Sequence, residues 1–126
     1  MNNLTESEFQ EIIHRRSNGV ISFAEFLEEL SARGINEYTI DVATGQATYK
    51  GIQSEFKTNS QINWVVANTF NSNKAIETIA NISLHFLDFL KEIAEAGIAY
   101  YQVNILEKKV VYFGIGGEKV EEQLKI

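Results

Sequence analysis

Apolar residues recur at helical spacing in two segments near the N-terminus, which predicts two amphipathic helices. The first follows TESE at residues 5–8, a capping box in which the Thr5 hydroxyl accepts from the Glu8 amide and the Glu8 side chain reaches back. The second follows SFAE at residues 22–25, another capping box, and Gly34 is the glycine expected just past its end. Each helix therefore carries its own start signal.

The chain then changes to alternation of apolar and polar residues, which predicts two antiparallel strands. Tyr38, Ile40 and Val42 share one face, and Tyr49 continues that face after the turn ATGQ. Within this turn, Gly45 is the residue expected to take a positive φ. We therefore expect a half-buried hairpin over residues 34–51.

The same pattern returns 63 residues later. Between residues 23–51 and 86–114, nine of 29 aligned positions are identical without a gap. The identities lie on the helix face, at the helix end and at inward strand positions, which predicts two copies of one structural unit. They pair Phe23 with Phe86, Phe26 with Phe89, Leu27 with Leu90, Glu29 with Glu92, Gly34 with Gly97, Ile35 with Ile98, Tyr38 with Tyr101, Tyr49 with Tyr112, and Gly51 with Gly114.

One helix on a two-stranded hairpin is only marginally stable in water, so the two copies are expected to close on each other. We predict an α+β fold of two helix–β-hairpin repeats related by a pseudo-two-fold axis, with a four-stranded antiparallel sheet and helices mainly on one face. A single domain is expected over residues 1–126, with repeat one at about 5–56, a connector at about 57–72 and repeat two at about 73–126.

The remaining segments are less periodic. The connector is rich in Asn, Ser and Thr around INWVVA, which predicts a short strand or helical turn at 62–67. Helices are expected at about 73–82 and 84–96. Val120 and Leu124 are spaced for a short helix at the C-terminus, joined to the hairpin by the glycine-rich linker GIGGEK.

Composition and charge narrow the classes of function. The chain has 126 residues, 44% of them apolar, a formal net charge of −6, and no run of Lys or Arg longer than two. This balance disfavours binding to nucleic acid or to a membrane surface, because both rely on basic patches. The sequence has no cysteine, no signal-peptide pattern and no apolar run of 18 residues, so a cytoplasmic location is expected.

No motif for catalysis, a cofactor or a metal rises above background. His14 and His85 lack a second ligand at helical spacing, and GIGGEK lacks the spacing of a phosphate-binding loop. The acidic residues of the helices are typical of a solvated surface rather than of acid–base catalysis; these are Glu25, Glu29, Asp88 and Glu92. We expect no catalytic residue, cofactor or metal. The sequence leaves open whether the protein is an enzyme and favours the interpretation that it is not.

The two hairpins differ on the face that points outward. The first carries Thr39, Asp41 and Thr48 there, whereas the second carries an apolar patch of Tyr100, Val111 and Phe113. Such a patch indicates an interface with a protein partner or a second copy, unless residues 62–70 or the C-terminal tail cover it.

The inward face carries four paired tyrosines, Tyr38, Tyr49, Tyr101 and Tyr112. Buried tyrosine hydroxyls need hydrogen-bond partners. If the hydroxyls gather near the pseudo-two-fold axis, they line a small polar pocket at the repeat junction. The alternative is that these rings simply pack in the core.

The second half also resembles a known family. Ala75–Ile76, followed by FLDFLKEIAEAGIAYYQVNILEKKVVYFGIGGE from Phe86 to Glu118, is similar to the YbcV/YdfO-like family of uncharacterised bacterial and prophage proteins, a domain-of-unknown-function family (DUF1398). FAEFLEELSARGINEYTIDVATGQATY resembles the N-terminal half of that family. The family's proline near the C-terminus is missing here. The resemblance implies no activity, and no functional residue carries over.

Two functions follow from these patterns. One is a small interaction or regulatory module that self-associates through Tyr100, Val111 and Phe113. The other is a small-ligand-binding protein, or an unrecognised enzyme, with a pocket at the repeat junction.

Overall fold

A computed structural model describes residues 4–52, 54–60, 62–81 and 84–124. Its elements follow one another as two helices and three strands, and then again as two helices and three strands. They are α1 (Glu6–Ser17), α2 (Phe23–Ala32), β1 (Ile35–Asp41), β2 (Ala47–Gly51), β3 (Glu55–Lys57), α3 (Ser72–Ala80), α4 (Phe86–Glu95), β4 (Ile98–Asn104), β5 (Lys109–Gly114) and β6 (Lys119–Gln123).

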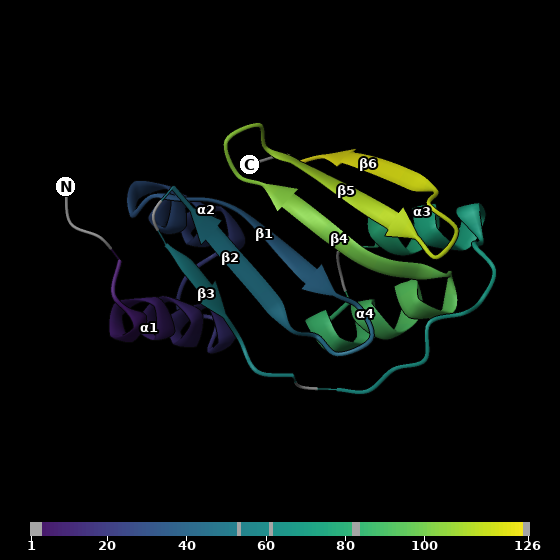
Figure 1. Ribbon diagram of the computed structural model, residues 1–126, viewed down its shortest axis with the longest axis horizontal. Helices are drawn as coiled ribbons and strands as arrows, with labels where there is room; N and C mark the ends of the chain where they lie inside the picture. Colours follow the sequence, from purple (N-terminus) through teal and green to yellow (C-terminus); the bar gives the residue numbers. More distant parts are fainter. Residues whose placement is uncertain (1–3, 53, 61, 82–83, 125–126) are drawn as a thin grey trace.

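The six strands form one antiparallel sheet in the order β3-β2-β1-β4-β5-β6. In Figure 1, α1 and α2 lie beside the β1–β3 half of the sheet, and α3 and α4 lie beside the β4–β6 half. Phenylalanine rings from α1, α2 and α4 all contact the tyrosine face of the sheet. The predicted α+β class is confirmed.

The predicted four-stranded sheet is wrong, because a third strand extends each hairpin. At one edge, β3 places Phe56 opposite Tyr49, and the Phe56 ring stacks on Phe9 from α1 at a centroid distance of 4.7 Å. At the other edge, β6 places Val120 opposite Tyr112. Each added strand satisfies backbone groups that would otherwise be unpaired at the hairpin edge.

The segment after β5 also differs from the prediction. GIGGEK is a tight turn in which the Gly114 amide donates to the Glu118 carbonyl at 2.7 Å and Gly117 has φ 92°. Residues 119–123 are a strand, not a helix. Val120 and Leu124 pack against the core at alternate positions, a spacing that also satisfies the helical pattern.

The two halves meet at the pairing of β1 with β4, which is centred on Thr39 opposite Gln102. On either side, Glu37 pairs with Asn104 and Asp41 with Tyr100. The position equivalent to Glu37 in the second half is Tyr100, and the position equivalent to Asn104 in the first half is Asp41, so the repeat converts one pair into the other. The equivalent positions of both halves are thus placed at equal distances from the centre of the sheet.

The local start and stop signals of the first two helices are confirmed. The Glu8 amide donates to the Thr5 hydroxyl at 3.2 Å, and the Glu25 amide to the Ser22 hydroxyl at 3.1 Å. Gly34 follows α2 with φ 90°.

The connector contains no regular element over residues 62–67, where a strand or helical turn was predicted. It is held by its backbone instead: the Trp64 amide donates to the Ala43 carbonyl and the Ala67 amide to the Ala94 carbonyl, both at 2.8 Å. The connector therefore ties the first hairpin to the end of α4.

Candidate functional site

The tyrosine face of the sheet is organised by two matching aromatic clusters. Phe26 of α2 makes edge contacts with Tyr38 at 6.4 Å and with Tyr49 at 6.3 Å. Phe89 of α4 makes the same two contacts with the tyrosines of the second half, at 6.1 and 6.3 Å. The helix spacing that repeats these phenylalanines and the strand alternation that repeats the tyrosines give the same geometry in both halves.

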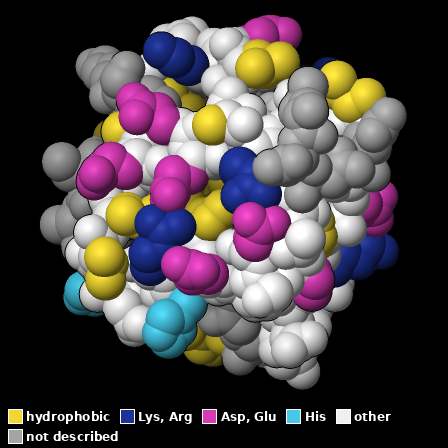
Figure 2. Space-filling model, turned by 90° about the vertical axis from the view of Figure 1, so that its left-hand side faces the viewer, with side chains coloured by type: hydrophobic (Ala, Val, Ile, Leu, Met, Phe, Trp, Pro, Cys, Tyr) yellow, Lys and Arg dark blue, Asp and Glu magenta, His cyan; other side chains and the backbone are white. Residues whose placement is uncertain are grey.

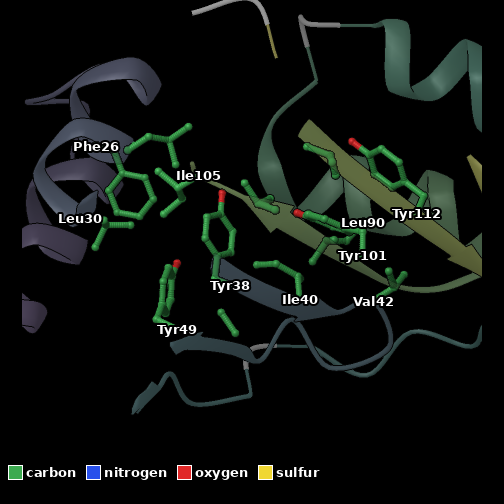
Figure 3. Close-up of a cluster of buried hydrophobic side chains, with 14 of the residues drawn as sticks. Phe26, Leu30, Tyr38, Ile40, Val42, Tyr49, Leu90, Tyr101, Ile105 and Tyr112 are labelled. Carbon is green, nitrogen blue, oxygen red and sulfur yellow. The ribbon is translucent and has the colours of Figure 1, made fainter. Parts of the chain in front are cut away.

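The four tyrosines, called the inner tyrosines below, line one cavity of about 590 Å³ between the helices and the sheet. They are Tyr38, Tyr49, Tyr101 and Tyr112. Each is at least nine-tenths buried. In Figure 3 the hydroxyls of Tyr38 and Tyr101 point into the space between Phe26 and Tyr112. The structure thus brings together all four pocket residues named from the sequence.

The rest of the inner cavity is mostly apolar. The floor between the tyrosines is formed by strand residues, among them Ile40, Ala47 and Val103. The N-terminal turns of α2 and α4 provide further phenylalanine rings, Phe23 and Phe86. Phe86 is 42% exposed, so the cavity opens to solvent at the start of α4.

The inner tyrosines differ in their hydrogen bonds. The Tyr112 hydroxyl donates to Oε1 of Glu122 at 3.1 Å. Among the described residues, the hydroxyls of Tyr38, Tyr49 and Tyr101 have no such partner. Burial raises the pKa of all four phenols, so they stay protonated and are available as donors.

Two charged side chains and one histidine also line the cavity, as far as the structure describes the chain. Arg16, from the last turn of α1, contacts the Phe23 ring, with Cζ 5.7 Å from the centroid. Glu122 lies on β6, where burial raises the pKa of its carboxyl and the hydrogen bond from Tyr112 partly offsets that rise. His85 lies at the N-cap of α4. The cavity therefore has a cationic group from the first half of the chain and a carboxyl group from the second.

The apolar patch predicted on the outward face lies on β4 and β5. The rings of Tyr100 and Phe113 stack at 4.6 Å, and Val111 is half-buried on the same face. Lys119 Nζ lies 5.6 Å from the Phe113 ring centroid, while Tyr100 is 43% exposed. A role for this patch as an interface stays a prediction.

A smaller hollow of about 290 Å³ lies between α1 and α2 and is lined by charged groups. These groups pair with one another: Arg15 contacts Glu29 at 3.0 Å, and Arg33 contacts Glu8 at 2.9 Å. Figure 2 shows this side of the molecule, where basic and acidic side chains lie next to each other. Both guanidiniums of this hollow are thus held by carboxylates of the same two helices.

The described part of the chain has neither a metal-ligand cluster nor a helix that could span a membrane. Those residues contain no group of three or more His, Asp or Glu side chains that could hold a metal ion. The His14 ring forms a hydrogen bond with Asn18, whose amide Nδ2 lies 2.9 Å from Nε2 of the ring. None of the helices within the same ranges is long and apolar enough to cross a membrane.

Arg16 and Glu122 are cavity residues that sequence reasoning missed. Basic residues are common in the last turn of a helix, so the sequence gives no reason to assign Arg16 a second role in a binding site. Glu122 was expected on a C-terminal helix, and only its strand pairing opposite Val110 directs it inward. A strand assignment for VEEQL would have placed Glu122 on the tyrosine side.

Comparison with known proteins identifies a family but no activity. The family model described as "Protein of unknown function (DUF1398)" matches residues 10–122, nearly the whole chain. No curated protein matches the chain.

Proposed function

Because the chain belongs to the DUF1398 family of proteins of unknown function, we propose its function from its own geometry: it binds a small, largely apolar molecule in the inner cavity. The volume of about 590 Å³ lies within the range of small-molecule sites, which are mostly apolar with a few placed polar groups. The inner cavity has this composition.

The observation that supports the proposal most directly is the set of three inner tyrosine hydroxyls without a partner among the described residues. These hydroxyls open onto the cavity, where they can donate to water or to a bound molecule. The hydroxyls of Tyr38, Tyr49 and Tyr101 are thus available to an acceptor in the cavity, either a ligand or the water that precedes it.

The same groups favour binding over general base catalysis. Burial raises the pKa of each inner tyrosine, so these phenols donate protons in hydrogen bonds and do not remove them from a substrate. The ligand we propose has an apolar body that fits between the phenylalanine rings and one or more acceptor atoms directed at the sheet.

The test uses N-phenyl-1-naphthylamine, a neutral dye whose fluorescence rises in apolar sites. We expect it to bind the wild type at one site per chain. Ala47→Leu adds bulk at a buried cavity position and should weaken binding by at least about tenfold. Ala47→Val, which introduces the residue found at position 110, should weaken it less.

The matched control is Thr48→Val, the next residue on the same strand, which points to the opposite face of the sheet. It should bind the dye like the wild type. Circular dichroism shows whether each variant is folded. The proposal is wrong if the folded wild type does not bind the dye, or if both Ala47 variants bind it unchanged.

We also propose that the two halves are copies of one unit within a single domain of a bacterial or prophage-related cytoplasmic protein. The symmetric register of β1 and β4 supports the duplication, as do the matching bulges at residues 35–37 and 98–100. The family resemblance supports the origin, and the absence of cysteine supports the location. Binding to nucleic acid is not expected, because the net charge is −6.

A further inference from the structure

We propose that the ligand of the inner cavity is an organic anion, an apolar body with one acidic group, and that its acidic group binds Arg16 at the cavity mouth. This inference rests on the proposed function and adds the charge and the orientation of the ligand. It follows from how the three arginines of the chain are partnered and from where charge lies around the cavity.

The arginines differ in their partners. Arg15 pairs with Glu29 and Glu11, and Arg33 pairs with Glu8. Arg16 forms no ion pair with any described residue; it donates from Nη1 to the Ile21 carbonyl at 3.2 Å and lies over the Phe23 ring. A guanidinium has five N–H donors, so most of those on Arg16 are left for a ligand.

The position of Arg16 places this free charge at the cavity. Arg16 lines the cavity wall and is itself exposed, so its guanidinium lies where the apolar lining meets solvent. Its positive charge also lowers the pKa of Tyr38 against the larger effect of burial, as expected for a cation near that hydroxyl. An anion held by Arg16 therefore lies close to the donor of Tyr38.

A negative charge on the cavity wall disfavours a ligand whose acidic group points away from Arg16. Among the described residues of the cavity wall, Glu122 is the other charged one, and it already accepts a hydrogen bond from Tyr112. A ligand carboxylate placed beside Glu122 would bring two like charges together in a partly buried site. An acidic group near Arg16 and an apolar body along the phenylalanine rings avoid this repulsion.

A guanidinium and a carboxylate form paired, charge-assisted hydrogen bonds, which are stronger than neutral ones. Because Arg16 is exposed, we take the lower end of the free energy that a hydrogen bond to a charged group usually contributes, which corresponds to roughly a tenfold change in affinity. A neutral molecule of the same shape gains nothing from this residue. Charge selectivity is thus the property that separates this inference from simple apolar binding.

The experiment measures displacement of N-phenyl-1-naphthylamine by two competitors of one skeleton, 2-naphthoate and 2-naphthalenemethanol. The wild type should bind the acid about tenfold more tightly than the alcohol. In Arg16→Gln this preference should disappear while affinity for the dye and the alcohol stays unchanged. Arg16→Lys should retain part of the preference, because it keeps the charge and loses the bidentate geometry.

Arg33→Gln is the matched control, since it removes the same charge from a residue that pairs with Glu8 away from the cavity. It should keep the full preference for the acid. The inference is overturned if the wild type binds acid and alcohol equally, or if Arg16→Gln keeps the preference. An equal loss of dye, acid and alcohol in Arg16→Gln would also overturn it, because that pattern reports damage to the site. Failure of the wild type to bind the dye would refute the proposed function itself.

Discussion

Replacing the inner tyrosines one at a time by phenylalanine should separate hydroxyls that stabilise the fold from hydroxyls that do not. Tyr38 and Tyr112 are similarly buried, at 5% and 4% exposure, and both make an edge contact with a helix phenylalanine. They differ in that only Tyr112 has a hydrogen-bond partner among the described residues, the Glu122 carboxyl at 3.1 Å. The substitution therefore isolates the effect of one oxygen atom.

Tyr112→Phe should lower the free energy of unfolding by about 1 kcal/mol, the net contribution of one hydrogen bond. Tyr38→Phe removes a hydroxyl that has no partner among the described residues, so it should leave stability unchanged or raise it by up to about 1 kcal/mol. Urea unfolding followed by circular dichroism measures both values, and the urea dependence should be the same for each variant.

Tyr38→Phe should also weaken binding of an acceptor-bearing ligand, such as 2-naphthoate, more than it weakens binding of the dye. Loss of binding without loss of stability is the behaviour of a residue retained for function. The reasoning is refuted if Tyr38→Phe destabilises the protein as much as Tyr112→Phe does. That result would mean that the chain itself satisfies the Tyr38 hydroxyl.

Two further predictions concern the fold. Gly34→Ala should lower the free energy of unfolding by about 1–2 kcal/mol, because Gly34 has a positive φ. Gly97→Ala should lower it by about 1–3 kcal/mol more, because the new Cβ would also lie 2.5 Å from the Thr69 carbonyl oxygen. Equal urea midpoints for the two variants would contradict this prediction. Hydrogen bonds from Arg33 and then Thr5 lower the pKa of Glu8 to about 2. The Glu8 carboxylate should thus stabilise the fold fully at a pH above its ordinary pKa of 4.5, and this stabilisation should be lost as the pH falls towards 2. The melting temperature of Glu8→Gln should therefore depend less on pH in that range than the melting temperature of the wild type.

The features that sequence predicted well are those set by neighbouring residues. A capping box needs two residues three positions apart, so Ser22 and Glu25 identify the start of α2 without tertiary information. The alternation of Tyr38, Ile40 and Val42 places these residues on one face of whichever sheet forms. Comparison of the two halves then indicated that both tyrosine pairs face the same side.

The edge strands were missed because their patterns are short or ambiguous. β3 has three residues, two of them charged, and its pairing with β2 depends on the packing of Phe56 against Phe9. Around β6, Val120 and Leu124 fit both a helix and a strand, and only the partner strand β5 decides between them. Edge pairing is a tertiary property, so local periodicity did not reveal it.

The tyrosines of the candidate site were predictable, but its charged residues and its geometry were not. The inner tyrosines were named from their repeated positions, yet whether their hydroxyls meet each other or a cavity depends on the distance between α2 and α4. The contribution of Arg16 was hidden for the same reason, because its lack of an acidic partner emerges only when α1 and α2 are placed together.

The seam between β1 and β4 has a mechanical consequence. Each helix pair rests on its own half of the sheet, so a small change of twist at this seam would move the pairs relative to each other with the strand ladders intact. Such a change would let the inner cavity accept ligands of different thickness. Shape selection by the walls is loose in such an arrangement, and discrimination falls to the few polar groups at fixed points along the cavity.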